Sequence, residues 1–224
     1  SNNADFIDEH YYRSADWFLK NAGRYDNYPR NGSKVFVGEY AVHADNSIVG
    51  SNRNNWQSAL ASASLMTGLE RNADVVQMAS YAPLFANIDA WQWAPDMIWV
   101  DNLKSYGTPD YYVQKQFSTN KGTDVVSITL DEKNIIGQDG LYASAVTDQA
   151  KKELIIKIAV LVVPHLDNPI FNPKSISKIH IVIVVMNFNI PVLNVFSIKK
   201  CYPLFRFVIG VFNGAAAPKT EGKQ

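Results

Sequence analysis

The sequence of 224 residues contains a single cysteine, Cys201, which excludes an intrachain disulfide and a cysteine metal cluster. It has no excess of charge, because Lys plus Arg and Asp plus Glu number 21 each. This balance gives no electrostatic reason to expect nucleic acid or an anionic membrane as a partner. Phosphate-binding glycine loops, Gly-x-Ser-x-Gly elbows and metal-spaced histidine clusters are also missing.

The first residues, Ser-Asn-Asn-Ala-Asp, lack the basic start and the apolar stretch of a secretory signal. Either a signal has been removed or the chain is a piece of a longer protein. The following half alternates apolar runs with amphipathic stretches, which is typical of strand-helix units on a parallel sheet. The pattern predicts strands over 5–12, 34–40 and 73–81, and helices over 15–22, 56–69 and 109–120. The tryptophan-rich segment 84–109 is predicted to be a long functional loop.

From residue 123 the character changes to strands, DVVSITL, LYASAVTD and KELIIKIAV, which predict the start of an antiparallel β domain. Beyond about Ala159 the apolar runs lose their clean alternation. Residues 179–188 fit a buried strand pair and a non-native, poorly ordered tail equally well. Polar residues and a proline interrupt this region, which disfavours a membrane span. Residues 215–224 are expected to form a flexible terminus.

Glu39 is the sharpest candidate for chemistry, because reacting groups of a strand-helix barrel lie where the strands end. Glu39 follows residues 35–37, which we expect to be buried on both faces of the sheet. Gly38 beside it leaves room for a substrate or a neighbouring backbone to approach closely. A strand-end glutamate in a salt bridge is an equally good interpretation of its position.

Two carboxyl groups acting together are one catalytic arrangement that Glu39 could belong to, as in retaining glycosidases, and Asp8 and Glu9 at the end of the first strand are the candidates for the second group. Adjacent strand residues point to opposite faces, so at most one of the two faces the site. His10 and Tyr12 share a face, where they could hydrogen-bond a nucleophile or a sugar hydroxyl. A histidine at such a position is also explained as a satisfied core residue.

Three tryptophans, Trp91, Trp93 and Trp99, lie in the predicted loop after the third strand. Aromatic faces stack on sugar rings, so these side chains could form the wall of a substrate subsite. Anchoring of the loop by buried aromatic rings explains them equally well.

The sequence resembles the α-L-arabinofuranosidases of glycoside hydrolase family 51 almost without a break from residue 5 to residue 122. The matching stretches are DEHYY, KVFVGEYA, NNWQSALASASLMTGLERNADVVQMASYAPLF, WQWAPDMIWVDN and YGTPDYYVQKQFSTNKG. The resemblance implies an α/β plus β fold, in which 1–122 form the last three βα units of a (β/α)8 barrel. Residues 123–224 would form at least part of a C-terminal β-sandwich, atypical after about 159.

The resemblance also implies the removal of terminal α-L-arabinofuranosyl groups, with retention, from arabinan, arabinoxylan or arabino-oligosaccharides and without a cofactor. Glu39 falls at the family's nucleophile, Tyr12 at a tyrosine that supports it, and His10 in the same motif. The acid/base glutamate of the family belongs to an Asn-Glu pair that this sequence lacks.

We therefore expect an incomplete portion of such an enzyme, as a truncated or frame-shifted gene would produce. The alternative is a catalytically inactive remnant that binds carbohydrate. An extracellular or periplasmic location is favoured, and the oligomeric state is left open.

Overall fold

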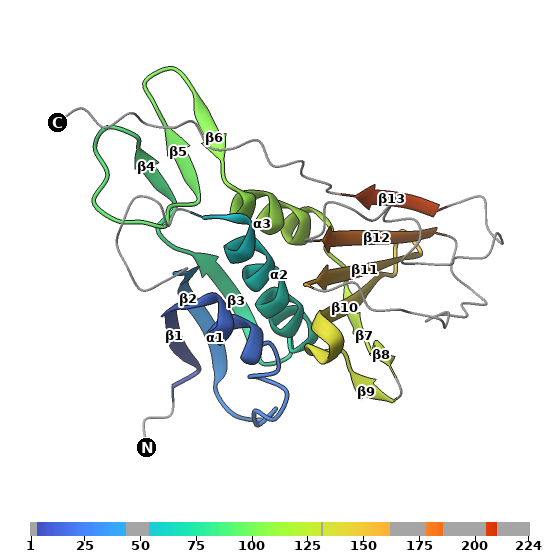
Figure 1. Ribbon diagram of the computed structural model, residues 1–224. Helices are drawn as coiled ribbons and strands as arrows, with labels where there is room; N and C mark the ends of the chain where they lie inside the picture. The colour runs from blue at the N-terminus through green and yellow to red at the C-terminus, as the bar shows by residue number, and fades with distance from the viewer. Residues whose placement is uncertain (1–3, 44–53, 131, 162–177, 186–204, 210–224) are drawn as a thin grey trace.

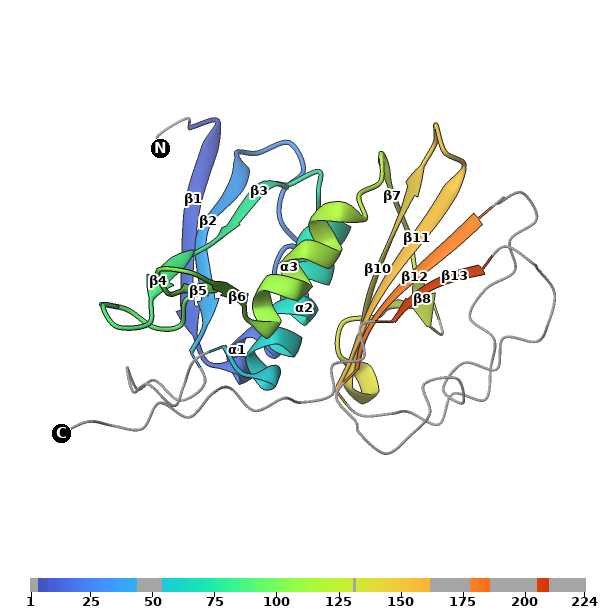
Figure 2. The same ribbon diagram turned by 90° about the horizontal axis from the view of Figure 1, so that it is seen from above.

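The computed structural model describes residues 4–43, 54–130, 132–161, 178–185 and 205–209. A three-stranded sheet, a layer of helices and a five-stranded sheet lie one behind another (Figure 1, Figure 2). The predicted flexible terminus 215–224 falls outside the described residues.

The first sheet contains β1 (Phe6–Arg13), β2 (Lys34–Val42) and β3 (Val76–Tyr81) in the order β1-β2-β3, and all three strands run parallel. Helices α1 (Ala15–Lys20) and α2 (Trp56–Arg71) supply the crossovers that parallel strands require. These elements agree with the sequence prediction, except that β3 begins three residues later.

Each α-helix of the described residues is preceded by a residue whose side chain caps its first turn. Ser14 caps α1, Asn55 caps α2 and Thr108 caps α3 (Pro109–Thr119), each by accepting a hydrogen bond from a backbone N–H of the first turn. Such caps satisfy amide groups that have no partner within the helix. Pro109 occupies the first turn of α3, as predicted, where its missing N–H costs nothing.

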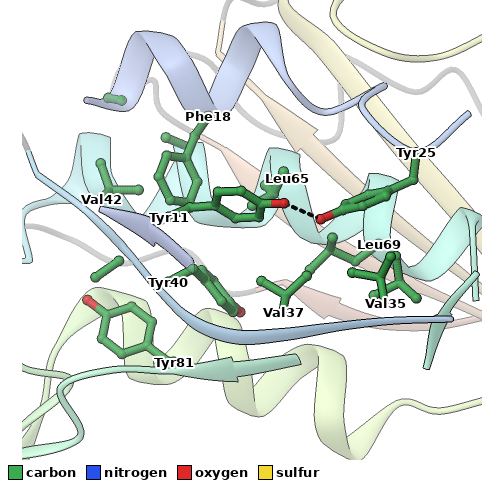
Figure 3. Packing of buried hydrophobic residues seen from close by; sticks show 14 of the residues in the cluster. Tyr11, Phe18, Tyr25, Val35, Val37, Tyr40, Val42, Leu65, Leu69 and Tyr81 are labelled. Atoms are coloured by element: carbon green, nitrogen blue, oxygen red, sulfur yellow. Dashed lines mark hydrogen bonds between the residues drawn. The ribbon is translucent and has the colours of Figure 1, made fainter. Parts of the chain in front are cut away.

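Helix α2 is buried on nearly every side because it packs against both sheets. Its alanine and serine residues keep it narrow, and Gly68 brings it against the carbonyl oxygen of Ala22, which a Cβ atom would approach to 1.9 Å. The core between α1, α2 and the first sheet is drawn in Figure 3 and includes Tyr11, Phe18, Val35, Val37, Tyr40, Leu65 and Leu69.

Segment 84–109 is not an irregular loop, as the sequence predicted, but contains a small sheet of its own. Strands β4 (Phe85–Asn87) and β5 (Ile98–Val100) pair in parallel, and β6 (Ser105–Gly107) pairs antiparallel with β5. Each strand has three residues, too few for the alternation by which a strand is recognised in a sequence. This small sheet follows directly after the C-terminal end of β3.

The five-stranded sheet begins with β7 (Asp124–Val126), β10 (Leu141–Asp148) and β11 (Glu153–Val160), which pair antiparallel as predicted. Between β7 and β10 lie a two-stranded ribbon, β8 (Thr129–Leu130) with β9 (Lys133–Asn134), and the short 3-10 helix Gln138–Gly140.

The rest of that sheet departs from the antiparallel prediction. Strands β12 (Lys178–Val185) and β13 (Phe205–Ile209) continue it from β11, and both new pairings are parallel. The sequence fitted residues 179–188 equally well to a buried strand pair and to a poorly ordered tail. In the structure, residues 179–185 belong to β12, and 186–188 lie outside the described residues. No helix among the described residues is long and apolar enough to cross a membrane.

Candidate functional site

An irregularity in β2 decides which way Glu39 points. Val35 and Val37 are both buried against the helices, and regular alternation would send Glu39 to the same side. The register with β1 shifts so that Asp8 lies opposite Phe36, whereas His10 lies opposite Glu39. One extra residue in β2 thus moves Glu39 to the face away from the helices, which is how bulges re-aim side chains.

Gly38 sits at this bulge, and both of its backbone polar groups have side-chain partners. Its N–H donates to Asp8 Oδ1 at 3.1 Å, and its carbonyl oxygen accepts a short hydrogen bond from the Ser80 hydroxyl. A Cβ atom on Gly38 would lie 2.2 Å from Asp8 Oδ1. A side chain at residue 38 would therefore displace the Asp8 carboxylate of the neighbouring strand from this hydrogen bond.

Tyr12 is the hydrogen-bond partner of Glu39. Its hydroxyl donates to Glu39 Oε2 at 2.7 Å, while His10 Nδ1 lies 3.6 Å from the same oxygen. Partial burial and the hydrogen bond to Glu39 raise the pKa of Tyr12 above its ordinary value, so the hydroxyl keeps its proton. The Glu39 side chain is 44% exposed, so an incoming molecule can reach it.

Asp8 and Glu9 point to opposite faces of β1, as predicted. Asp8 lies on the face of Glu39, where its Oδ2 is 2.9 Å from His10 Nε2. Glu9 lies on the helix face, where its carboxylate accepts hydrogen bonds from Tyr25 (2.8 Å), Tyr28 (3.1 Å) and Arg24 (3.4 Å). Glu9 is thereby committed to the packing around α1.

The arrangement suits a carboxylate that attacks or accepts a proton. Among the described residues, the basic side chain near Glu39 is the His10 ring, not a lysine or an arginine, which argues against the salt-bridge interpretation of its position. A neutral donor such as Tyr12 orients a carboxylate without neutralising its charge. In the described part of the chain, no group of three or more His, Cys, Asp or Glu residues could hold a metal ion.

A fully buried carboxylate lies behind the site and has no signal in the sequence beyond its place in the first turn of a helix. Asp110 in α3 accepts hydrogen bonds from Ser62 Oγ at 2.7 Å and Asn54 Nδ2 at 3.2 Å, and Asn54 also bonds the hydroxyl of Tyr81. Complete burial raises the pKa of Asp110 to about 6. The Tyr81 ring packs on Tyr40, the neighbour of Glu39, at 5.7 Å.

A family model described as the α-L-arabinofuranosidase C-terminal domain matches residues 38–188, more than half of the chain. The chain belongs to the α-L-arabinofuranosidases. The match to this family includes Gly38 and Glu39 but not β1, and it continues past Ala159, where the resemblance was expected to fade.

Individual arabinofuranosidases show the same relationship. The extracellular exo-α-L-arabinofuranosidase of Streptomyces chartreusis is 52% identical over 124 residues, which are 55% of this chain and 14% of that protein. α-L-Arabinofuranosidase 2 of Arabidopsis thaliana is 39% identical over 155 residues, which are 69% of this chain and 22% of that protein. The chain spans about a quarter or less of each relative.

Among solved structures, an arabinose-bound arabinofuranosidase, MgGH51, superposes with a TM-score of 0.64 and 34% identity. The superposition covers 71% of this chain and 26% of that one. Its name places the similarity in glycoside hydrolase family 51, in agreement with the resemblance found in the sequence.

The three tryptophans of segment 84–109 differ in their exposure. Trp99 in β5 is 7% exposed and its ring meets that of the half-buried Trp91 edge-on at 6.1 Å. Trp93 is 58% exposed. Burial of Trp99 favours the anchoring interpretation for that residue, and Trp93 presents the ring that a sugar could reach.

Proposed function

We propose that this chain supplies the nucleophile of a retaining α-L-arabinofuranosidase, and that Glu39 is that nucleophile. The observation that carries the proposal is the bulge that turns Glu39 out of the core, together with the hydrogen bond from Tyr12 to its Oε2. A strand-end carboxylate with a fixed orientation and a reachable side chain is what attack on an anomeric carbon requires.

In the proposed mechanism, the Glu39 oxygen not bonded to Tyr12 attacks the anomeric carbon while the bond to the leaving oxygen breaks. A separate acid group gives its proton to the leaving oxygen, and water then hydrolyses the arabinosyl ester with that same group as the base. Tyr12 holds the carboxylate in one orientation through both steps. No cofactor enters these steps.

The acid/base group is proposed to lie in a part of the protein beyond the described residues. Glu9 faces the helices, and both oxygens of Asp8 are engaged by Gly38 and His10. We propose that residues 1–122 are the last three units of a (β/α)8 barrel and 123–224 belong to a C-terminal β-sandwich. The parallel order β1-β2-β3 supports this fold, with helices on one face and with β1 and β3 at the edges of the sheet that the described residues form.

Arabinan, arabinoxylan and arabino-oligosaccharides are the proposed substrates, and Trp93 is proposed to contact them. An extracellular location is proposed on the name of the Streptomyces relative.

The proposal is tested with two arabinofuranosides that differ in their need for an acid. A 2,4-dinitrophenyl leaving group departs without protonation, whereas a sugar in arabinan needs it. We expect this chain to release 2,4-dinitrophenol, the Glu39→Gln variant to release none, and arabinan to remain intact. Glu132→Gln, which alters an exposed glutamate in the turn between β8 and β9, is the matched control and should retain the activity. Release by Glu39→Gln equal to wild type would refute the role of Glu39.

The alternative function is carbohydrate binding without cleavage, and the absence of a second available carboxylate beside Glu39 among the described residues favours it. In that case calorimetry would detect binding of arabino-oligosaccharides, Trp93→Ala would weaken the binding, and the dinitrophenyl substrate would remain uncleaved.

A further inference from the structure

We propose that Asp8 is a positioning residue that controls the orientation of the Glu39 side chain and the tautomer of the His10 ring. The proposal rests on the proposed role of Glu39 as the nucleophile. Asp8 lies on the strand next to that of Glu39 and is linked to it through two other residues. One carboxylate oxygen accepts a hydrogen bond from the Gly38 N–H, and the other is hydrogen-bonded to His10.

The first contact stabilises the bulge. A bulge takes backbone groups out of the regular ladder, and a buried or crowded N–H without a partner is costly. Asp8 Oδ1 accepts the Gly38 N–H at 3.1 Å, and the Ser80 hydroxyl satisfies the Gly38 carbonyl. Glu39 is the next residue, so the hydrogen bond from Gly38 to Asp8 fixes the backbone from which the carboxylate projects.

The second contact fixes the tautomer of His10. An ionised carboxylate can only accept, so the 2.9 Å contact to Asp8 Oδ2 keeps a proton on Nε2. In the neutral ring Nδ1 is then an acceptor, 3.6 Å from Glu39 Oε2. Among the described residues, Tyr12 therefore donates to Glu39 and His10 does not, so the carboxylate keeps more of the negative charge that makes it a nucleophile.

These two contacts also argue against Asp8 as the second catalytic carboxyl group. A general acid needs an oxygen that faces the leaving group, and each Asp8 oxygen already faces a donor of the protein. The carboxylate of Asp8 acts on the reaction through Gly38 and His10.

The test combines a spectroscopic readout with kinetics in the full chain. Nitrogen-15 shifts of His10 and the amide proton shift of Gly38 are measured in wild type and in Asp8→Asn, whose amide offers one acceptor oxygen to two donors. We expect Asp8→Asn to move the ring toward the Nδ1–H tautomer or to shift the Gly38 amide upfield. Gly38→Ala should disturb His10 in the same way, because its Cβ would displace the Asp8 carboxylate. Gly32→Ala is the matched control, since its Cβ would meet Pro29 at an ordinary 3.6 Å.

With the dinitrophenyl substrate, we expect Asp8→Asn to lower kcat by about 100-fold and to change KM by less than about threefold, because misaimed reacting groups slow the chemical step. Asp8→Glu retains the carboxylate and should recover part of the loss. Circular dichroism identical to wild type shows that the variants are folded.

Unchanged His10 and Gly38 shifts in Asp8→Asn, or an unchanged kcat, would overturn the proposal. The predicted shifts in a chain with no Glu39-dependent hydrolysis would confirm the geometric role of Asp8 and refute the proposed function, so the two failures are distinguishable.

Discussion

A buried ion pair joins the helix layer to the five-stranded sheet and gives a quantitative prediction. Lys157 in β11 is 1% exposed, and its ammonium group bonds Glu70 Oε1 at the end of α2. Glu70 Oε2 accepts a hydrogen bond of 2.5 Å from Ser144 in β10, and the ammonium lies 5.3 Å from the ring centroid of Phe117. Burial lowers the pKa of Lys157, and the charge of Glu70 opposes that shift.

The substitution Glu70→Gln removes the charge that compensates the buried ammonium and leaves the shape of the side chain almost unchanged. Breaking one side of a buried ion pair costs about 3–5 kcal/mol, because the remaining charge has neither its partner nor water. A domain has a total stability of about 5–15 kcal/mol, so the loss would be a large part of it. Replacing both partners, as in Glu70→Leu with Lys157→Met, should recover most of the stability.

Urea unfolding followed by far-ultraviolet circular dichroism measures these differences. The matched control is Lys151→Met, which breaks the pair of Lys151 with Asp148, because the Lys151 side chain is 65% exposed. We expect no resolvable change for this control, since exposed pairs contribute little. A Glu70→Gln variant within about 1 kcal/mol of wild type would show that the pair is hydrated, contrary to the reasoning from burial.

Three further predictions concern the site and its support. The pKa of Asp110, about 6 against an ordinary 3.8, means that between these pH values the folded state holds a proton that the unfolded state has lost. The unfolding free energy should therefore fall by up to roughly 3 kcal/mol as the pH rises from about 4 to about 7, and Asp110→Asn should remove this fall in thermal unfolding measured across that range. Tyr12→Phe removes a hydrogen bond to a charged group, so kcat on the dinitrophenyl substrate should drop by about 10- to 100-fold without loss of folding; an unchanged kcat would contradict the support of Glu39 by Tyr12. Gly68→Ala should destabilise the chain by about 1–3 kcal/mol, because its Cβ would lie 1.9 Å from the Ala22 carbonyl oxygen, whereas Gly32→Ala in the same urea assay should be neutral.

The elements of the first half could be predicted because their patterns are strong. The valine and phenylalanine residues of 34–37 predicted β2, and the small and apolar residues at helical spacing in 56–69 predicted α2. The alternation of side chains along a strand placed His10 and Tyr12 on one face. The antiparallel pairing of β10 with β11 followed from two apolar strands joined by a short charged turn.

The bulge at Gly38 could not be predicted, although it determines the site. A bulge depends on the register between neighbouring strands, and the residues Asp8 and Ser80 that satisfy it lie 30 and 42 positions away in the sequence. The burial of Trp99 could not be predicted either, because packing against other strands decides which aromatic ring is covered. The parallel pairing of β12 and β13 was missed because a run of apolar residues carries no information on strand direction.

The role of Glu39 is tested most directly by covalent trapping. The chain is incubated with 2,4-dinitrophenyl 2-deoxy-2-fluoro-α-L-arabinofuranoside, which forms the glycosyl ester and releases it slowly, and the labelled peptide is identified by mass spectrometry. We predict one fluoroarabinosyl group on Glu39 and none on the Glu39→Gln variant. A label on another carboxylate, or an unlabelled wild-type chain, would contradict the assignment of Glu39 as the nucleophile.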